Sequence, residues 1–249
     1  FWNFRGSFRI AGVLDVGTHC SLVRRQNGNW LFLDAYSLDR QARKKVAGLT
    51  NDGDDIEAIL NVHPFHTVHV ERMHALYPQA ALYGTARHHD RFPGLPWEKT
   101  RTEDAALQEL FGPDLQFSVP RGVDFIPEDQ SLHFASVMVY HPASRTMHVD
   151  DTLNYLRLPS MARAVGLGDK VAFHPTLAKV LEKRSGAAGE FRDWARALIE
   201  RWRKAENLCA AHTAALLARD NSGPSLHERW LRALEKIEST VAAHEKKFG

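Results

Sequence analysis

Cysteine is scarce in this sequence of 249 residues: Cys20 and Cys209 are the only two, and they form no CxxC pair. A disulfide scaffold is therefore not indicated, and a reducing compartment, the cytoplasm, is the expected location. No apolar run is long enough to span a bilayer, and no signal-peptide pattern is visible. We therefore expect no membrane partner.

An excess of charge of one sign is also missing. Thirty-two Lys and Arg residues against thirty Asp and Glu residues leave a formal net charge of +2. Nucleic-acid binding depends on a strong basic excess, so no nucleic-acid partner is expected. Internal repeats and low-complexity linkers are missing too, and 44% hydrophobic residues are enough for a sizeable core. We expect one domain over residues 1–249.

Common catalytic motifs are likewise missing: there is no GxSxG, no P-loop and no dinucleotide-binding fingerprint. Histidines, in contrast, are gathered in residues 59–77, which read ILNVHPFHTVHVERMHALY. An apolar run of strand length ends just before His63, and His66 and His69 follow at intervals of three. Neutral imidazole is a good ligand of zinc, iron or manganese. The stretch predicts a metal site, with an exposed helix face as the alternative.

A proline divides this histidine stretch. Because Pro64 disfavours helix at the residue before it, we predict that a strand ends near His63 and that a helix begins at His66 or Thr67. In this interpretation His66 and His69 lie one turn apart on one face of the helix.

The elements around the histidines predict a mixed sheet. Residues 21–26 and 30–34 flank Asn27-Gly28, which is typical of a hairpin with a two-residue type I′ turn. After the predicted helix, Pro78 is followed by a short strand over residues 80–83. The strand, helix and strand form a βαβ unit, which favours a parallel pair.

The middle of the chain is less regular. Residues 87–97 contain two prolines and a glycine and predict a loop, with His88, His89 and Asp90 in a surface turn. A short helix is expected over residues 103–111. Further strands are predicted over residues 115–119, 123–126, 131–140 and 145–149.

The final third is mostly helical. One amphipathic helix carries Trp194 and Trp202, and a second, over residues 226–241, carries Trp230. Ser225 and Glu228 form a capping-box pattern at the start of the second helix. Because three indole rings would leave a large apolar patch if exposed, we expect them to be buried.

In this order the segments resemble the metallo-β-lactamase superfamily, roughly over residues 8–215. The likeness is carried by LFLDAY, ILNVHPFHTVH, ALYPQAALYG, SLHFASVMVYHPASRTMHVDDTL and AENLCAAHTAAL. It implies an α/β fold, an αββα sandwich of two mixed β-sheets flanked by helices, with metal ligands on loops at one edge of the sheets.

The resemblance also implies a ligand set. It places the motif histidines at His63, His66 and His69, and the last ligand, at the end of a late strand, at His212. The histidine before the hairpin falls on His133. The metal-bridging carboxylate, which would also accept the proton of the attacking water, falls on Asp151 or Asp150. His148 would support the ligands from the hairpin, and His174, which also ends an apolar run, is a further candidate for the site.

The sequence departs from the superfamily pattern in one respect. The spacing is HxxHxxH in place of HxHxDH, and Thr67 or Val68 stands where the motif has an aspartate. Glu71 could replace that carboxylate if the helix turned it inward. A site with one metal ion and an altered site with two are therefore both kept as alternatives.

The function that the resemblance implies is a metal-dependent hydrolase acting on an ester, lactone, thioester or phosphoester of a small-molecule substrate. The expected cofactor is a divalent metal, zinc first, with iron or manganese as alternatives. A catalytically degenerate binding or sensing module is a second hypothesis, because the motif aspartate is missing. A redox di-iron site is a third, disfavoured by the few carboxylates near His63. A homodimer is left open.

Overall fold

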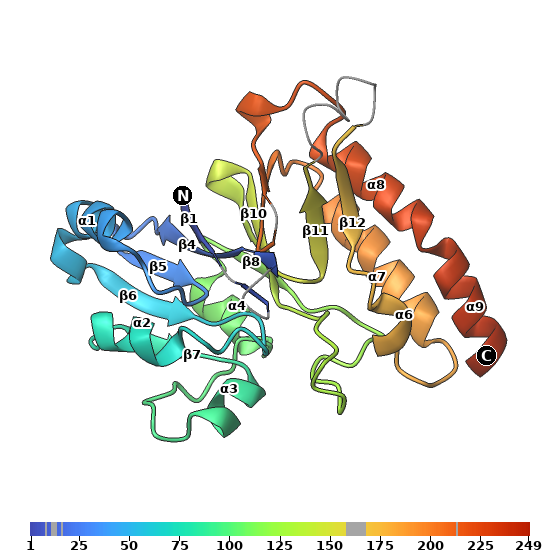
Figure 1. Ribbon diagram of the computed structural model, residues 1–249, viewed down its shortest axis with the longest axis horizontal. Coiled ribbons are helices and arrows are strands. Elements are labelled where there is room, and N and C mark those ends of the chain that lie inside the picture. Colours follow the sequence, from blue (N-terminus) through green and yellow to red (C-terminus); the bar gives the residue numbers. More distant parts are fainter. Residues whose placement is uncertain (8, 11–13, 16, 158–167, 213) are drawn as a thin grey trace. The chain divides into compact units, whose positions relative to one another are not determined.

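The computed structural model describes residues 1–7, 9–10, 14–15, 17–157, 168–212 and 214–249 (Figure 1). The chain forms two compact units, Phe1–Phe117 (unit 1) and Ser118–Gly249 (unit 2), and each is described by itself. The expectation of one domain over residues 1–249 stays a prediction. No described helix combines the length and the apolar composition that crossing a lipid bilayer requires.

Unit 1 contains a five-stranded mixed sheet. Its strands, in spatial order, are β1 (Trp2–Gly6), β4 (Thr18–Arg24), β5 (Trp30–Leu33), β6 (Ile56–Leu60) and β7 (Ala81–Tyr83). β4 is antiparallel to β1 and β5, whereas β6 is parallel to β5 and β7. The predicted hairpin and the predicted parallel βαβ pair are therefore confirmed. A separate antiparallel pair is formed by β2 (Arg9–Ile10) and β3 (Leu14–Asp15).

The loop between β4 and β5 differs from the predicted turn. Arg25 N donates to the Asn29 carbonyl over 2.8 Å, and Gly28 N donates to the Arg25 carbonyl over 3.1 Å. Gly28 has a φ of 95°, whereas Asn27 is not among the described residues with positive φ. A type I′ turn needs positive φ at both central residues, so the two-residue turn was wrong. The loop has three residues, with the bulge at Gly28.

Helices cover the unit 1 sheet. The helices described in unit 1 are α1 (Arg40–Leu49), α2 (Val70–Leu76), α3 (Ala86–Arg91) and α4 (Ala106–Phe111), with a 3₁₀ turn, η1 (Asn51–Gly53), and it is α1 and α2 that cover the sheet. Val46 of α1 and Met73 of α2 are fully buried in one cluster with Phe32 and Ile59 of the strands. The apolar face of the sheet is therefore closed by α1 and α2, and the chain that leaves β6 enters α2 on this side.

Unit 2 contains a second mixed sheet. Its strands, in spatial order, include β14 (Ala215–Leu216), β13 (Asn207–Ala210), β10 (Thr146–Val149) and β9 (Met138–His141), and β8 (Gln116–Ser118) lies at the boundary of the units. β10 is parallel to β13 and antiparallel to β9. An antiparallel pair, β11 (Leu153–Leu156) and β12 (Lys170–Phe173), stands beside this sheet.

Two predicted strands of unit 2 are shorter or missing. Residues 123–126 form no strand, and Val123 makes only an isolated bridge with Leu181. The strand predicted over residues 131–140 begins at Met138. Ser136 N donates to Thr152 Oγ1 over 3.0 Å, and Thr152 Oγ1 donates to the Phe134 carbonyl over 2.9 Å. A side chain, not a neighbouring strand, therefore takes these backbone hydrogen bonds.

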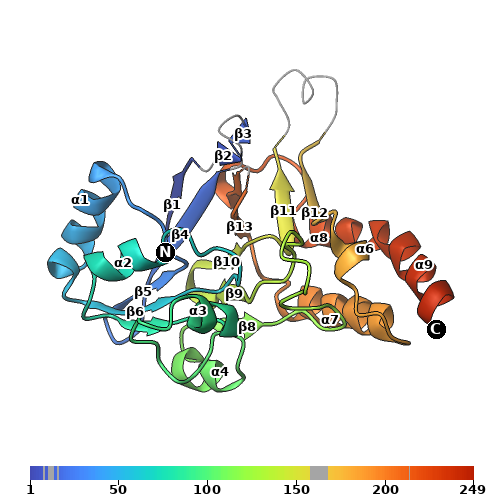
Figure 2. The ribbon, with the colours of Figure 1, turned by 60° about the horizontal axis from the view of Figure 1, so that its bottom comes forward.

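The helices of unit 2 are α6 (Leu177–Val180), α7 (Ala187–Arg201), α8 (Leu226–Lys236) and α9 (Glu238–Phe248), with 3₁₀ turns η2 (Pro142–Ser144) and η3 (Ala218–Asp220). The predicted helix over residues 226–241 is divided at Ile237, which ends α8 and precedes α9. α8 contacts β12, α7 and α9 (Figure 2).

The three tryptophans of these helices are buried, as predicted. Trp202 and Trp230 are each 1% exposed, and Trp194 is 9% exposed. The ring centroids of Trp202 and Trp230 lie 6.4 Å apart, so α7 and α8 pack against each other through these two indole rings. The capping box at the start of α8 is confirmed, because Ser225 N donates to Glu228 Oε2 over 2.7 Å and Glu228 N donates to Ser225 Oγ over 3.2 Å.

Candidate metal centre

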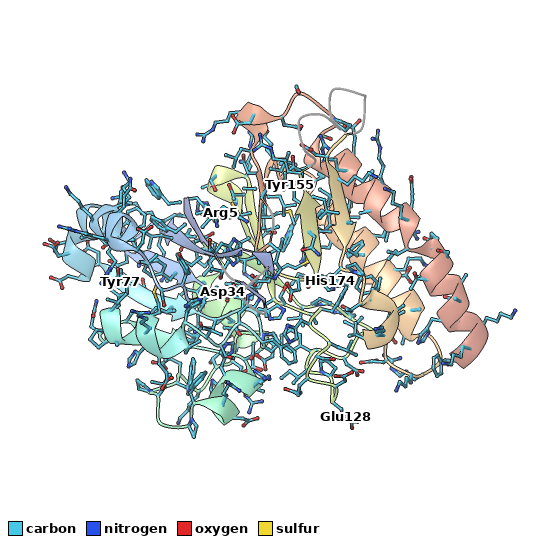
Figure 3. All side chains as sticks on the ribbon, viewed as in Figure 1. Arg5, Asp34, Tyr77, Glu128, Tyr155 and His174 are labelled. Atoms are coloured by element: carbon cyan, nitrogen blue, oxygen red, sulfur yellow. The ribbon has the colours of Figure 1, made fainter. Side chains whose placement is uncertain are left out.

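The histidine turn of unit 1 is fixed by the aspartate that follows β5. Asp34 N donates to the Leu60 carbonyl over 2.8 Å, and Asp34 Oδ1 accepts a hydrogen bond from Val62 N over 2.8 Å. Asp34, labelled in Figure 3, has a φ of 60°, a left-handed conformation that aspartate tolerates better than most residues. The ends of β5 and β6 are thereby joined, and the chain is held just before His63.

His63 and His66 form a pair. His66 N donates to the His63 carbonyl over 3.1 Å, which closes a turn, and the two imidazole rings are stacked with centroids 4.1 Å apart. Their possible ligand nitrogens lie within 4.8 Å of one another. Phe65 N donates to His63 Nδ1 over 3.0 Å. Because Nδ1 accepts this bond, the ring carries its proton on Nε2, and coordination there would require the proton to move or leave.

The predicted helix begins later than expected, and this changes the place of the third histidine. α2 starts at Val70, and His66 lies in the preceding turn, so His66 and His69 do not share a helical face. His69 Nδ1 lies 2.9 Å from Ser37 Oγ, and the His69 ring meets the ring of Tyr36 edge-on. Burial, helped by the charge of His66, lowers the pKa of His69. The assignment of His69 as a metal ligand stays a prediction.

The predicted surface turn at His88 was wrong. Residues 86–91 form α3, and His88 is fully buried. Thr85 N donates to His88 Nδ1 over 3.2 Å, so the imidazole takes the place that glutamate or glutamine has in a capping box. Burial lowers the pKa of His88 to about 3, and the ring is therefore neutral. The sequence signal for this capping box was Thr85 three residues before a histidine.

α3 also supports the histidine turn. Arg87 Nη1 donates to the Pro64 carbonyl over 3.1 Å, and its guanidinium lies 4.5 Å from the centre of the Phe65 ring. A cation over an aromatic face is attracted by the ring quadrupole. The backbone between His63 and His66 is therefore held from α3 as well as from Asp34.

Each unit also contains a buried histidine and aspartate pair. In unit 1, possible ligand atoms of His19 and Asp34 lie within 4.8 Å, and in unit 2 those of His148 and Asp150 do. All four side chains are at most 2% exposed. His19 was missed because nothing in its neighbourhood in the sequence distinguishes it from a strand residue.

In unit 2 the strand ends bring together two predicted ligands. Ala211 N donates to the Val149 carbonyl over 3.0 Å, which continues the parallel pairing of β10 and β13 beyond the strands. Asp151 and His212 follow these ends, and His212 Nε2 lies 2.8 Å from Asp151 Oδ1. Asp151 is 3% exposed. A carboxylate and an imidazole that are far apart in sequence are thus held in contact.

Two further histidines lie in the same region of unit 2. His133 Nε2 donates to the Gln130 carbonyl over 3.1 Å. His174, labelled in Figure 3, follows β12, and its Nδ1 lies 2.7 Å from Thr176 Oγ1. Burial lowers the pKa of His174, opposed by the charge of Asp151 and reinforced by those of His212 and His133. His174 is therefore close enough to Asp151 and His212 to interact with them electrostatically.

The chemistry of these donors suits a divalent transition metal. Each unit presents a pair of potential ligands: His63 and His66 in unit 1, and Asp151 and His212 in unit 2. Imidazoles with one carboxylate are the ligand type that zinc, iron and manganese share.

No family model matches the sequence, and the comparison with curated proteins found no match. Solved structures do match. A metallo-β-lactamase from Erythrobacter litoralis is 17% identical, with 94% of this chain and 92% of that chain covered and a TM-score of 0.57. The metallo-β-lactamase FIM-1 from Pseudomonas aeruginosa, in its mono-zinc form, is 14% identical over 95% and 91% of the two chains, with a TM-score of 0.55.

A third match, a metallo-β-lactamase from Hirschia baltica, is 12% identical over 95% of this chain and 92% of that chain, with a TM-score of 0.55. Identities this low show the fold and not the activity. The expected α/β class, with mixed sheets flanked by helices, is confirmed. The chain has the metallo-β-lactamase fold, as the sequence resemblance implied.

Proposed function

We propose that the chain is a metal-dependent hydrolase whose candidate ligands for a divalent metal are His63 and His66 in unit 1 and Asp151 and His212 in unit 2. The observation that carries the proposal is the contact of His212 with Asp151, because two residues 61 positions apart meet at the ends of adjacent parallel strands. The His63–His66 pair and the fold support it. Zinc is the expected ion, with iron or manganese as alternatives.

A metal in such a donor set lowers the pKa of water to about 7 and polarises a carbonyl or phosphoryl group. The residues of the chain accept the proton and hold the ligands in position. Asp151, with Asp150 as the alternative, is the carboxylate that would accept the proton of the attacking water. His212 stands beside Asp151 and limits its movement. Asp34 and Arg87 hold the turn that carries His63 and His66.

The substrate class we propose is a small ester, lactone, thioester or phosphoester, since each has a polarisable group that a metal-activated water attacks. A loading of one metal is favoured over two, because Thr67 and Val68 offer no carboxylate where the superfamily motif has an aspartate. Val68 is 68% exposed, and its side chain therefore has no part in a buried site. FIM-1, which shares the fold, has been crystallised in a mono-zinc form.

A second candidate function is a binding or sensing module without catalysis, and the observation that favours it is the same missing aspartate. The test is turnover of a panel of generic esters, lactones, thioesters and phosphoesters by protein loaded with zinc, iron or manganese. We expect metal-dependent turnover of at least one class, abolished in Asp151→Asn and retained in His227→Ala, which changes a histidine of α8. Metal binding without turnover of any class would support the binding module and reject the hydrolase.

A further inference from the structure

Two successive residues of α3, Arg87 and His88, lie at the histidine turn of unit 1, residues 63–66. Arg87 Nη1 donates to the Pro64 carbonyl, inside the turn. His88 is a neighbour of the two histidines of the turn, because the charges of His63 and His66 both lower its pKa. A fully buried imidazole therefore stands between α3 and the turn.

The start of α3 is fixed to the strand end that carries the turn. Glu103 Oε1 accepts a hydrogen bond from Ala86 N, at the first residue of the helix, over 2.8 Å. The residue before it, Thr102, donates from Oγ1 to the Asn61 carbonyl over 2.9 Å. Asn61 lies two residues before His63. α3 is thus bonded, through this loop, to the same backbone that leads into the turn, and it can act as a fixed support.

The hydrogen bonds of His88 decide which ring nitrogen carries the proton. Thr85 N donates to Nδ1 over 3.2 Å, and a backbone N–H can only donate, so Nδ1 is the acceptor. Thr85 Oγ1 lies 2.9 Å from the same nitrogen and can donate to it as well. The ring is neutral, because burial lowers its pKa to about 3. Its single proton is therefore on Nε2.

The Nε2–H group of His88 has one candidate acceptor among the described residues. Nε2 is buried, and no group other than the His66 backbone is its hydrogen-bond partner there. The hydrogen bond with this backbone raises the pKa of His88 against the effect of burial, which is the sign expected when a carbonyl accepts from the ring. A buried N–H without an acceptor would be destabilising.

We propose that His88 is a positioning residue of the candidate metal centre, which donates from Nε2 to the His66 carbonyl and so holds the backbone of this ligand beside His63. Arg87 holds the same turn two residues earlier, at Pro64. Groups that fix the orientation of a ligand increase metal affinity, because less freedom is lost when the metal binds. This inference rests on the proposed function, since it concerns ligands of the same metal.

The test makes the same substitution at two neighbouring histidines of the full chain. His88→Leu removes both hydrogen bonds of the ring, whereas His89→Leu, the matched control, changes a histidine that is stacked on Trp97 with ring centroids 5.2 Å apart. Zinc affinity is measured by competition with a chromophoric chelator, and the ligand geometry by the d–d absorption of the cobalt(II)-loaded protein. We expect His88→Leu to weaken zinc binding by about 10-fold and to shift the cobalt bands, and His89→Leu to change neither.

A second variant keeps the hydrogen bonds. A glutamine side chain has an oxygen that can accept from Thr85 N and an amide nitrogen that can donate to the His66 carbonyl. His88→Gln should therefore restore the wild-type zinc affinity and cobalt spectrum. A structural role alone would lower the melting temperature of the metal-free protein in His88→Leu without this difference in zinc affinity.

The tautomer can be measured in the metal-free wild type. The ¹⁵N chemical shifts of the imidazole, identified by their absence in His88→Gln, should show a neutral ring near neutral pH with its proton on Nε2. A proton on Nδ1 would overturn the inference, and this measurement decides the question even if His88→Leu does not fold.

The outcomes separate this inference from the proposed function. If the wild type binds zinc and His88→Leu keeps the wild-type affinity and cobalt spectrum, the positioning role is overturned while the hydrolase proposal stands. Equal losses in His88→Leu and His89→Leu, or in His88→Leu and His88→Gln, also overturn it. If the wild type binds none of zinc, iron or manganese, the proposed function fails, and the positioning role of His88 fails with it.

Discussion

Replacing Trp230 by alanine should destabilise unit 2 strongly. The indole is 1% exposed and lies 6.4 Å from the ring of Trp202, between α7 and α8. An aromatic side chain of this kind buries about 150–250 Å², which at about 25 cal/mol per Å² corresponds to roughly 4–6 kcal/mol of transfer free energy. Measured tryptophan truncations in cores cost about 3–5 kcal/mol, and we expect a loss in this range.

The assay is thermal and urea unfolding followed by tryptophan fluorescence and circular dichroism. For a chain of this length each kcal/mol lowers the melting temperature by about 2–4 °C, so the expected drop is roughly 6–20 °C. Trp230 Nε1 has no hydrogen-bond partner among the described residues. Trp230→Phe therefore loses buried area but no hydrogen bond, and it should fall between the wild type and Trp230→Ala.

The same substitution should also weaken zinc binding. α8 contacts β12, and β12 pairs with β11, which begins two residues after Asp151, so a looser helix should lower zinc affinity as well as stability. An unchanged melting temperature and unchanged zinc content in Trp230→Ala would show that α8 is peripheral, and the supporting role of the helix would be wrong.

Purified protein should bind fewer than two equivalents of zinc, because Thr67 and Val68 supply no carboxylate; two full equivalents by plasma mass spectrometry would refute this. Asp34→Ala leaves the Val62 amide without its acceptor and puts alanine at a φ of 60°, so it should lower the free energy of unfolding in urea by about 1–3 kcal/mol. Asp34→Asn keeps an acceptor and tolerates this conformation, so its loss should be smaller. Equal losses in the two variants would contradict the role of the bond. The pKa of His88 is lowered to about 3, below its usual 6.5, so between these pH values the unfolded chain binds a proton that the folded chain does not. This group should therefore reduce the free energy of unfolding by roughly 1.4 kcal/mol per pH unit as the pH falls from about 6.5 toward 3. The difference in unfolding free energy between wild type and His88→Gln should therefore change with pH in this window, and a constant difference would show that His88 is not held neutral.

Local patterns predicted those elements whose signal lies within the element itself. The β4–β5 hairpin, the parallel pair of β6 and β7, and the capping box at Ser225 each depend on neighbouring residues, and each was found. Some of the details that failed depend on distant partners. In place of the strand predicted from Ser131, Ser136 N donates to Thr152 Oγ1, and no local pattern predicts that a threonine 16 residues after Ser136 accepts this bond.

The candidate site shows the same division. His212 and Asp151 were placed in the site by the resemblance, and they can meet because adjacent parallel strands end at the same edge of a sheet. His88 could not be recognised as buried, because its burial depends on α3 in a segment whose prolines and glycine predicted a loop.

The most direct test of the metal site is an anomalous difference map, collected at the zinc edge, from crystals of the zinc-loaded protein. We expect a peak bonded to a nitrogen of His212 at about 2.0–2.1 Å and to an oxygen of Asp151 at about 2.0–2.2 Å. A map with no peak at these side chains, or with a peak bonded to neither Asp151 nor His212, would contradict the proposed site.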